Sequence, residues 1–363
     1  MSAAAASTPN TSLDTSGLRR LNYIGSKLQL LDWLFSVIKT QTGCHTLSEK
    51  RVVDVFAGTG VVSYGLRQEG AVVIGNDAEN YSAIITHALA KSAYNEQCQS
   101  AIATLNAELT ADAHKADAPG FITRNYSPEG SERTFFTIDN ARRADYVRRR
   151  LEEMRPTISP DDHAFLLASL LVSTDRIANV AAVYGCYLKQ FKATAQRPLV
   201  IEPIHQNPTP GNAGTHVLNC DATTPEFLLQ TDGDIAYVDP PYNGRQYSKN
   251  YFPLAMLAKT PAQQQTEPPL KGKTGIPETC FVSDLCKKGR ALDSMRTLLA
   301  GLRCPWIFVS YNTEGIIPEA EMTKMLQELG DVSVVRRDYK RFKSYKYNDD
   351  KQIQELLYCL RRS

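Results

Sequence analysis

The sequence predicts a doubly wound α/β fold, in which a mainly parallel sheet is interrupted by an inserted, mostly helical region. Three observations predict this fold. Residues 51–77 contain two apolar runs joined by a glycine turn and a helical stretch, and residues 234–238 form another apolar run. Between them, residues 94–206 carry a mainly helical pattern. Buried strands that alternate with helices are typical of a parallel sheet covered on both faces.

The first βαβ unit begins at residues 51–56, where a β-branched run enters the sequence Ala-Gly-Thr-Gly. A helix is expected over residues 61–68, and a second strand over residues 71–75, just before Asp77. The right-handed crossover of such a unit places the glycine turn at the carboxyl edge of the sheet. Open α/β sheets bind their ligands at that edge.

The remaining elements continue the pattern. Further strands are expected at residues 234–238, 306–310, 332–335 and 356–360. A long polar loop is expected at residues 259–278, and a basic hairpin at residues 336–346. The predicted organisation is a disordered tail (1–17), a sheet domain in two segments (18–93 and 207–363) and an inserted subdomain (94–206).

Composition excludes several classes of protein. The 363 residues have a formal net charge of +2 and are 42% hydrophobic, enough to bury one sizeable core. No stretch reaches the ~18 apolar residues of a membrane span, and residues 1–17 resemble neither a signal peptide nor an anchor. The eight cysteines include no C-x-x-C pair and suit no common zinc site, so no metal is implied. We expect a reduced, cytoplasmic protein.

Positive charge is concentrated in two runs. One comprises Arg142, Arg143, Arg148, Arg149 and Arg150. The other, in the basic hairpin, comprises Arg336, Arg337, Lys340, Arg341, Lys343 and Lys346. Basic clusters on an otherwise balanced protein can form a local footprint for phosphates. The alternative for each run is a solvated structural face.

The most specific motif is Asp239-Pro240-Pro241-Tyr242, at the end of a predicted buried strand. Consecutive prolines lack amide hydrogens and have restricted backbones, so they end the strand and stiffen the loop. The Asp239 carboxylate and the backbone carbonyls are then expected to point into a cleft. The alternative is a plain Pro-Pro turn after a strand.

This motif resembles the catalytic motif of the amino-group DNA methyltransferases. Two others resemble their cofactor motifs: the run from Asp54 to Gly60, and Tyr23-Ile-Gly-Ser-Lys27 upstream. The order of the motifs, with an insertion before the catalytic one, resembles the alpha group, the DNA adenine methylase family. The resemblance covers residues 18–361 and implies a Rossmann-like class I methyltransferase sheet. The sheet domain would then be catalytic, and the insertion would recognise the target.

The resemblance implies methyl transfer from S-adenosylmethionine to the N6 amine of adenine in double-stranded DNA. The N6 lone pair is delocalised into the ring, so the amine is a poor nucleophile. Asp239 and the backbone carbonyl of Pro240 can accept both N6 hydrogens and make the lone pair available for in-line attack. A base inside a duplex is out of reach, so it must be flipped out, and Tyr242 is the expected stacking platform.

The expected cofactor residues come from several segments. Gly58 and Gly60 allow a sharp turn and a close approach to the ligand, although the full G-x-G-x-x-G fingerprint of NAD sites is missing. Asp77 ends the second strand, where an acidic residue accepts hydrogen bonds from ribose hydroxyls, and the alternative is a helix N-cap. By resemblance, Asp221 contacts the cofactor adenine.

Four residues have further roles implied by the resemblance or by their position. Tyr23 helps to cradle the cofactor, and Lys27 and Asp54 lie near its methionine end. Phe56 packs beside the cofactor, or it belongs to the core. Residues 310–312 are also expected to line the cleft, with a structural role as the alternative.

DNA contacts are expected around the catalytic loop, in the insertion and in the basic hairpin. Arg245 binds a phosphate and Tyr247 stacks or fills the gap left by the flipped base, with structural roles as the alternative. The arginine run of the insertion would lie beside DNA. Basic residues that alternate with aromatics suit backbone contact, so the hairpin is the strongest candidate. Its expected contacts are Lys340, Arg341 and Lys343.

Two other kinds of function stay open at this point. The substrate amine can instead be cytosine N4, an RNA adenine or a protein glutamine, although relatives acting on cytosine or glutamine commonly carry Ser or Asn in place of Asp239. A DNA-binding regulator without catalysis would not need the intact Asp239, Tyr242, Gly58 and Gly60. The usual setting of such an enzyme is restriction-modification, with a cognate endonuclease that forms no stable complex with it.

Overall fold

The computed structural model describes residues 13–339 and 353–362. Within them, seven strands form one sheet in the order β3-β2-β1-β4-β5-β7-β6. Strands β1 to β5 are parallel, and β7 is antiparallel to both of its neighbours. The strands are β1 (Arg51–Asp54), β2 (Val72–Asn76), β3 (His216–Leu218), β4 (Ile235–Val238), β5 (Trp306–Asn312), β6 (Gly330–Tyr339) and β7 (Ile353–Arg362). The predicted doubly wound α/β sheet is confirmed.

The strand order reverses at β1, which pairs with β2 on one side and with β4 on the other. The connections from these strands therefore leave in opposite directions and open a crevice at their carboxyl ends. The glycine turn follows β1, Asp77 follows β2, and the Asp-Pro-Pro-Tyr motif follows β4. The topology thus brings the main motifs of the sequence to one edge of the sheet.

Helices cover both faces of the sheet, and the alternation of side chains along each strand sends apolar residues into both layers. Helices α1 and α2 share a core with Val52, Val73 and Tyr237. Helices α8, α11 and α12 pack on the opposite face against Val53 and Ile74. These helices are α1 (Leu31–Thr42), α2 (Val61–Gln68), α8 (Pro225–Leu228), α11 (Ala291–Gly301) and α12 (Glu319–Gln327).

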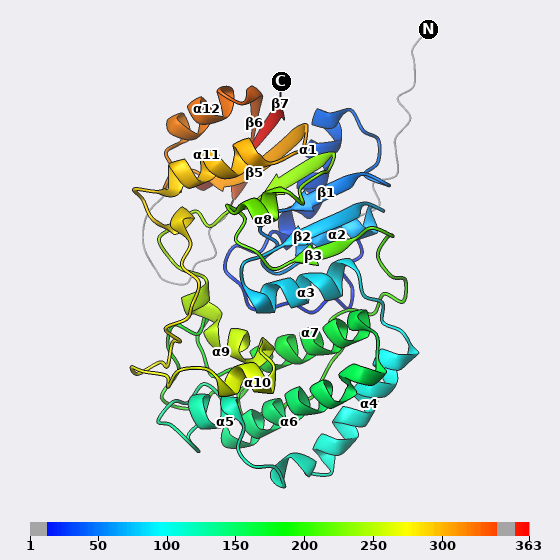
Figure 1. The fold of residues 1–363 in the computed structure, drawn as a ribbon, viewed down its shortest axis with the longest axis vertical. Helices are drawn as coiled ribbons and strands as arrows, with labels where there is room; N and C mark the ends of the chain where they lie inside the picture. Colours follow the sequence, from blue (N-terminus) through cyan, green and yellow to red (C-terminus); the bar gives the residue numbers. More distant parts are fainter. Residues whose placement is uncertain (1–12, 340–352, 363) are drawn as a thin grey trace.

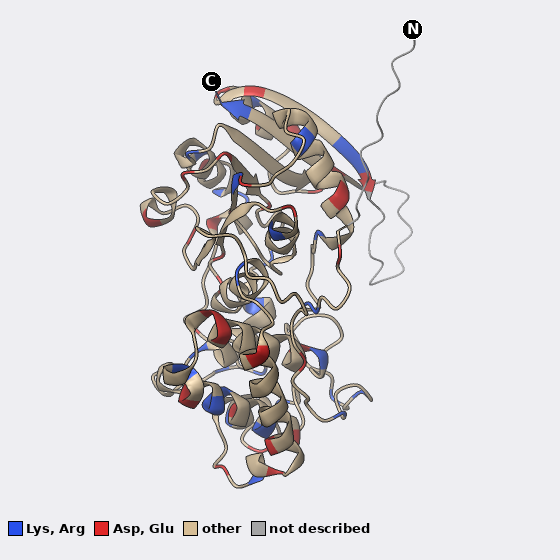
Figure 2. Ribbon diagram, turned by 90° about the vertical axis from the view of Figure 1, so that its right-hand side faces the viewer, with Lys and Arg blue, Asp and Glu red and all other residues tan. Residues whose placement is uncertain are grey.

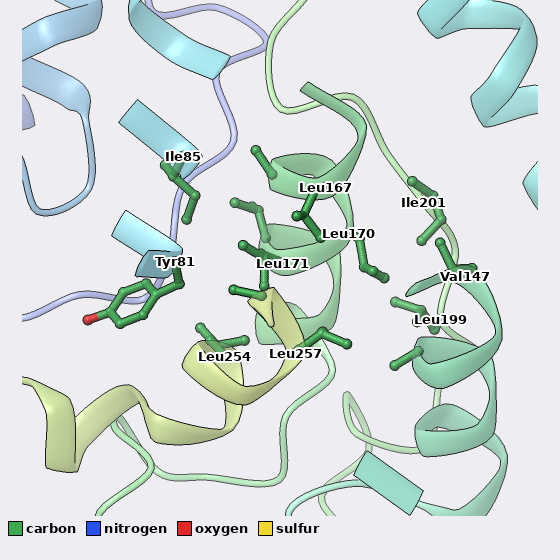
Figure 3. Close-up of a cluster of buried hydrophobic side chains, with 14 of the residues drawn as sticks. Tyr81, Ile85, Val147, Leu167, Leu170, Leu171, Leu199, Ile201, Leu254 and Leu257 are labelled. Carbon is green, nitrogen blue, oxygen red and sulfur yellow. The ribbon is translucent and has the colours of Figure 1, made fainter. Parts of the chain in front are cut away.

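A second layer of helices lies below the sheet in Figure 1, beyond α3 (Asn80–Ala90). Figure 3 shows Ile85 of α3, Leu171 of α7 and Leu257 of α9 converging in the core that joins the two parts. Helix α9 begins at Ser248, six positions after Tyr242, so the loop after the Asp-Pro-Pro-Tyr motif leads directly into the helical layer. The layer comprises α4 (Glu96–Thr110), α5 (Phe121–Tyr126), α6 (Ile138–Met154), α7 (Pro160–Arg176), α9 (Ser248–Ala258) and α10 (Pro261–Gln265).

Short 3-10 helices complete the described elements: η1 (Leu28–Leu30), η2 (Ala113–Lys115), η3 (Arg155–Thr157) and η4 (Asp284–Cys286). Residues 259–278, expected as a long polar loop, contain α10 and are tied to the helical layer. The Arg133 guanidinium donates to the carbonyls of Gly272 and Lys273 at 3.0 and 3.1 Å. The Tyr126 hydroxyl donates to the Gly275 carbonyl at 3.1 Å.

The arginine run of the insertion lies on α6, and Figure 2 shows acidic and basic residues interleaved over the helical layer. Every guanidinium of the run is paired with a carboxylate of the chain itself. The pairs are Arg142–Glu129, Arg143–Asp139, Arg148–Glu152, Arg149–Asp117 and Arg150–Glu108. These pairs favour the structural interpretation of the run over the expected place beside DNA, because each charge is already neutralised.

The basic hairpin joins β6 to β7, but Lys340, Arg341 and Lys343 lie outside the described residues. Their expected contact with DNA therefore stays a prediction. Over the described ranges, no helix combines the length and the apolar character that crossing a bilayer requires.

Candidate active site

A cleft of about 930 Å³, open solvent included, lies at the carboxyl ends of β1, β2 and β4. It brings together ten of the residues singled out in the sequence: Tyr23, Lys27, Phe56, Gly58, Asp77, Asp221, Asp239, Pro240, Tyr242 and Tyr247. Asp54, Gly60 and Arg245 do not line it. The cleft is also lined by residues to which the sequence gave no role in the site, among them Glu79, Phe281, Ser283 and Cys286.

Asp77 holds the glycine turn against the end of β2. Its Oδ2 accepts the backbone N–H of Gly58 at 2.8 Å, and its Oδ1 accepts that of Glu79 at 2.9 Å. Burial raises the pKa of the Asp77 carboxyl, and the two amides partly oppose that rise. Gly58 has a φ of +54°, a left-handed conformation that glycine adopts without strain. Asp77 therefore shapes the floor of the cleft as well as lining it.

Gly60 and Asp54 support the cleft from outside. A Cβ added to Gly60 would come within 3.0 Å of Leu89, and the φ of Gly60 is +71°. Asp54 is fully buried, and its Oδ2 accepts a hydrogen bond from Ser63 at 2.6 Å. Burial raises the pKa of Asp54 to about 7. Asp54 does not line the cleft, and its expected place near the methionine end of the cofactor stays a prediction.

The carboxylate of Asp239 forms a buried ion pair with Lys27. Lys27 Nζ lies 2.8 Å from Asp239 Oδ1 and 3.2 Å from Glu355 Oε1. Burial raises the pKa of Asp239 to about 6, while Lys27 lowers it and Glu355 raises it further. Burial also opposes the charge of Lys27, but Asp239 and Glu355 outweigh it and hold the pKa of Lys27 well above its usual value. The cleft therefore presents an anionic Asp239 at neutral pH.

Sequence analysis missed Glu355, because a lone acidic residue at the start of an apolar strand carries no motif. It did single out residues 310–312, but these do not line the cleft. Ser310 Oγ instead donates to Glu355 at 2.7 Å, and the Tyr311 hydroxyl accepts the N–H of Ile317 at 3.1 Å. Residues 310–312 thus have a structural role behind the cleft.

The tyrosines that line the cleft are held by contacts with other rings. The Tyr23 ring stacks on Tyr247 with centroids 5.3 Å apart, and on Tyr251 with centroids 4.7 Å apart. Tyr242 meets Tyr311 edge to face at 6.2 Å, and Lys27 Nζ lies 5.8 Å from the Tyr242 centroid. These contacts fix the orientations of the rings in the cleft.

The loop after the Asp-Pro-Pro-Tyr motif is hydrogen-bonded to residues 281–283. Gln246 Nε2 donates to the Ser283 carbonyl at 3.0 Å, and Gln246 Oε1 accepts the Ser283 N–H at 2.9 Å. Ser248 Oγ donates to the Phe281 carbonyl at 2.6 Å. Arg245, between them in the loop, is exposed and has no carboxylate partner among the described residues.

Two further acidic residues, Asp221 and Glu79, line the cleft. Asp221 Oδ1 closes a turn by accepting from Thr223 N and Oγ1, at 3.0 and 2.9 Å. Glu79 is partly buried, and burial together with Asp77 raises its pKa to about 8. A residue two positions after a strand-end aspartate is a weak sequence signal, so Glu79 emerged only from the structure.

Most of the chain matches a known protein family. Residues 23–294 match the family described as D12 class N6 adenine-specific DNA methyltransferase. Type II methyltransferase M.CviAII of Paramecium bursaria Chlorella virus 1 is 37% identical over 94% of this chain and 98% of its own length. Type II methyltransferase M.NlaIII of Neisseria lactamica is 36% identical over 90% of this chain and 93% of its own length. No solved structure matches significantly. The chain belongs to the D12 class of N6 adenine-specific DNA methyltransferases.

Proposed function

We propose that site-specific methylation of adenine N6 in duplex DNA is performed here with S-adenosylmethionine as the methyl donor and Asp239 as the acceptor of the amine hydrogens. The observation that carries the proposal is that only one carboxylate oxygen of Asp239 has a hydrogen-bond donor among the described residues. Its Oδ1 is held by Lys27, while no described residue donates to its Oδ2. Oδ2 is thus available to an amine in the cleft, and the Pro240 carbonyl is the second acceptor.

Bound S-adenosylmethionine would supply an electrophilic methyl group on a sulfonium. On taking up that methyl group, the amine nitrogen would gain a positive charge and would then have to lose a proton. Asp239 Oδ2 is placed to accept that proton, and Lys27 keeps the carboxylate anionic beforehand. The contribution of the chain is therefore alignment of the amine and electrostatic stabilisation of its developing charge.

The lining of the cleft fits the proposed cofactor. Gly58 lines the cleft in a left-handed conformation and has no side chain, so its backbone can approach a ligand closely. The Glu79 carboxylate has no hydrogen-bond partner among the described residues, and carboxylates there suit ribose hydroxyls. Ser26 Oγ is buried and likewise unpartnered in the described part of the chain. Unsatisfied polar groups of this kind in a cleft are expected to meet a polar ligand.

The rim of the cleft offers cations for the DNA backbone. Three segments meet there: Asn22 Nδ2 donates to the Ala182 carbonyl at 3.0 Å, and the Tyr184 N–H donates to the Asn250 carbonyl at 2.9 Å. These segments carry four exposed cations with no carboxylate partner in the described ranges: Arg20, Lys189, Arg245 and Lys249. The paired arginines of α6 have no such free charge. We infer that the rim contacts phosphates, with the basic hairpin as a further contact.

The relatives named above are type II methyltransferases, so we infer a restriction-modification setting in which a separate endonuclease reads the same target. Recognition of that target is assigned to the helical layer, which borders the catalytic loop through α9. The family match is to adenine-specific enzymes acting on DNA, which favours adenine over cytosine N4, RNA or protein glutamine as the substrate.

Methyl transfer to unmethylated genomic DNA with a labelled donor tests the proposal, followed by nucleoside analysis of the product. Wild type is expected to yield N6-methyladenine. Asp239→Ala and Asp239→Asn should reduce the single-turnover rate by roughly three or more orders of magnitude, because the amine loses its anionic acceptor. Both variants should still bind cofactor and DNA.

Asp331→Asn is the matched control, since Asp331 is an exposed carboxylate on β6 and its loss should leave the rate unchanged. A product methylated at cytosine, or transfer to RNA in preference to DNA, would contradict the substrate. A near-wild-type rate in Asp239→Ala would contradict the catalytic assignment. Tight DNA binding by wild type without any transfer would favour a regulator.

A further inference from the structure

Glu355 occupies an unusual place for an acidic side chain. It lies on β7 and is only 6% exposed. Its Oε1 lies 3.2 Å from Lys27 Nζ and accepts a hydrogen bond from Ser310 Oγ at 2.7 Å. A buried carboxylate is costly unless it is paired and hydrogen-bonded, and both conditions are met here. Glu355 and Ser310 both lie C-terminal to the segment 23–294 that defines the family match.

Sheet register explains how the group reaches the site. Ser310 on β5 is directly opposite Leu357, and Leu357 is two positions from Glu355, so all three side chains lie on one face. That face is the one covered by α1, and Lys27 immediately precedes η1 and α1. The antiparallel strand β7 thus places the Glu355 carboxylate next to Lys27, which lies far from it in the sequence.

The Lys27 ammonium is consequently shared by two buried carboxylates, Asp239 and Glu355. One cation cannot neutralise both, so the three side chains carry a net negative charge. If Glu355 were neutral, Lys27 would interact with Asp239 alone. A carboxylate held more tightly by an ammonium is a weaker acceptor for another donor, and here that donor is the substrate amine.

We propose that Glu355 is a positioning residue for methyl transfer: by holding Lys27 together with Ser310, it keeps Asp239 Oδ2 available and strongly accepting toward the target amine. This inference rests on the proposed function, because it assumes that Asp239 accepts the amine hydrogens. Glu355 acts through Lys27, and its contacts in the structure are with Lys27 and Ser310.

The pH dependence provides a readout that a merely structural role would not change. The ionisable groups that interact electrostatically with Asp239 are Lys27, Glu355, Tyr237, Tyr247 and Asp54. Among them, Glu355 raises the pKa of Asp239, whereas Lys27 lowers it. Removing the charge of Glu355 removes the raising influence and leaves Lys27 to Asp239 alone. Both changes lower the pKa of Asp239, so activity should persist to lower pH.

The experiment compares wild type, Glu355→Gln and the control Glu319→Gln in single-turnover methyl transfer across the acid range. Glu319 is a partly exposed carboxylate on α12 that pairs with Arg336, away from the cleft. Glu355→Gln should lower the rate about tenfold at neutral pH, as expected for a misaligned acceptor. Its acid limb should move down by roughly half a pH unit or more. Affinity for cofactor and DNA should change little, and Glu319→Gln should match wild type throughout.

A folded Glu355→Gln protein whose rate and acid limb both equal those of wild type overturns the inference. So does a variant that loses only thermal stability. If Glu355→Gln does not fold, Ser310→Ala decides, because it frees Glu355 from its hydrogen bond without changing any charge. A reduced rate with unchanged cofactor affinity supports the inference, and a wild-type rate overturns it. Failure of wild type itself to methylate adenine would instead contradict the proposed function.

Discussion

Lys27 Nζ lies 2.8 Å from Asp239 Oδ1, although 212 positions separate the two residues in the sequence. One belongs to the motif before the first helix, and the other to the motif after β4. Their contact joins the N-terminal part of the cofactor cleft to the proposed catalytic carboxylate. Because this contact occupies Oδ1 of Asp239, the proposed substrate amine has to approach Oδ2.

The rate of methyl transfer should fall at acidic pH as Asp239 becomes protonated. Burial raises the pKa of Asp239 to about 6, and the group is needed as an anion. Activity should therefore be complete above about pH 7 and be lost as the pH falls through about 6. Single-turnover rates measured from about pH 5 to 8 will check this, with circular dichroism at each pH to confirm folding. An unchanged rate at pH 5 in a folded enzyme would argue against an ionised Asp239.

Tyr242 should contribute through its ring. Tyr242→Phe should keep substantial activity, because stacking on a flipped base does not need the hydroxyl. Tyr242→Ala should lose roughly 1–3 kcal/mol of transition-state stabilisation, the value of one base–aromatic stack. Fluorescence of 2-aminopurine at the target position separates flipping from chemistry. Equal activity of the Ala and Phe variants would assign the stacking role to another ring, with Tyr247 the first to test.

Asp77→Ala should weaken cofactor binding by roughly 1.5–3 kcal/mol, the value of hydrogen bonds to a charged group. It should also lower thermal stability, because the amides of Gly58 and Glu79 lose their acceptor. Glu79→Gln is the matched comparison, since the Glu79 side chain accepts no hydrogen bond from the described residues. It should weaken binding without a loss of stability. Calorimetric titration and thermal unfolding distinguish the two, and unchanged affinity in both variants would exclude the acidic pair as ribose contacts.

DNA affinity should depend on the rim cations in a manner sensitive to salt. Arg245→Ala combined with Lys249→Ala should reduce the slope of log K against log salt by up to about two phosphate contacts. Replacing Lys340, Arg341 and Lys343 with Ala should reduce it by up to about three. The control is Arg149→Ala with Arg150→Ala, whose guanidiniums are paired with Asp117 and Glu108. A wild-type slope in the rim variant, together with a reduced slope in the α6 control, would show that DNA contacts α6 and not the rim of the cleft.

Much of the fold was predictable because its signals are local. The β-branched run before Gly58, the strand before Asp239 and the glycine turn each follow from the residues themselves, and their order implied a parallel sheet with a switch point. The role of the arginines on α6 was harder to predict, because a run of charges in a sequence does not reveal which carboxylates pair with them. Glu108 and Asp117 lie more than thirty positions from the arginines that they neutralise.

The sequence by itself determined the family and the sheet, and it singled out Asp239, Tyr242 and Gly58, which line the cleft, since short motifs at strand ends require only local geometry. Tertiary structure alone decided what surrounds them. It buried Asp54 outside the lining of the cleft, gave Asp77 two backbone amides to hold, and brought Glu355 to Lys27. The physical reason is that burial and pairing depend on groups brought together from distant parts of the chain by sheet register and helix packing. No periodicity or motif records which distant side chain completes an ion pair.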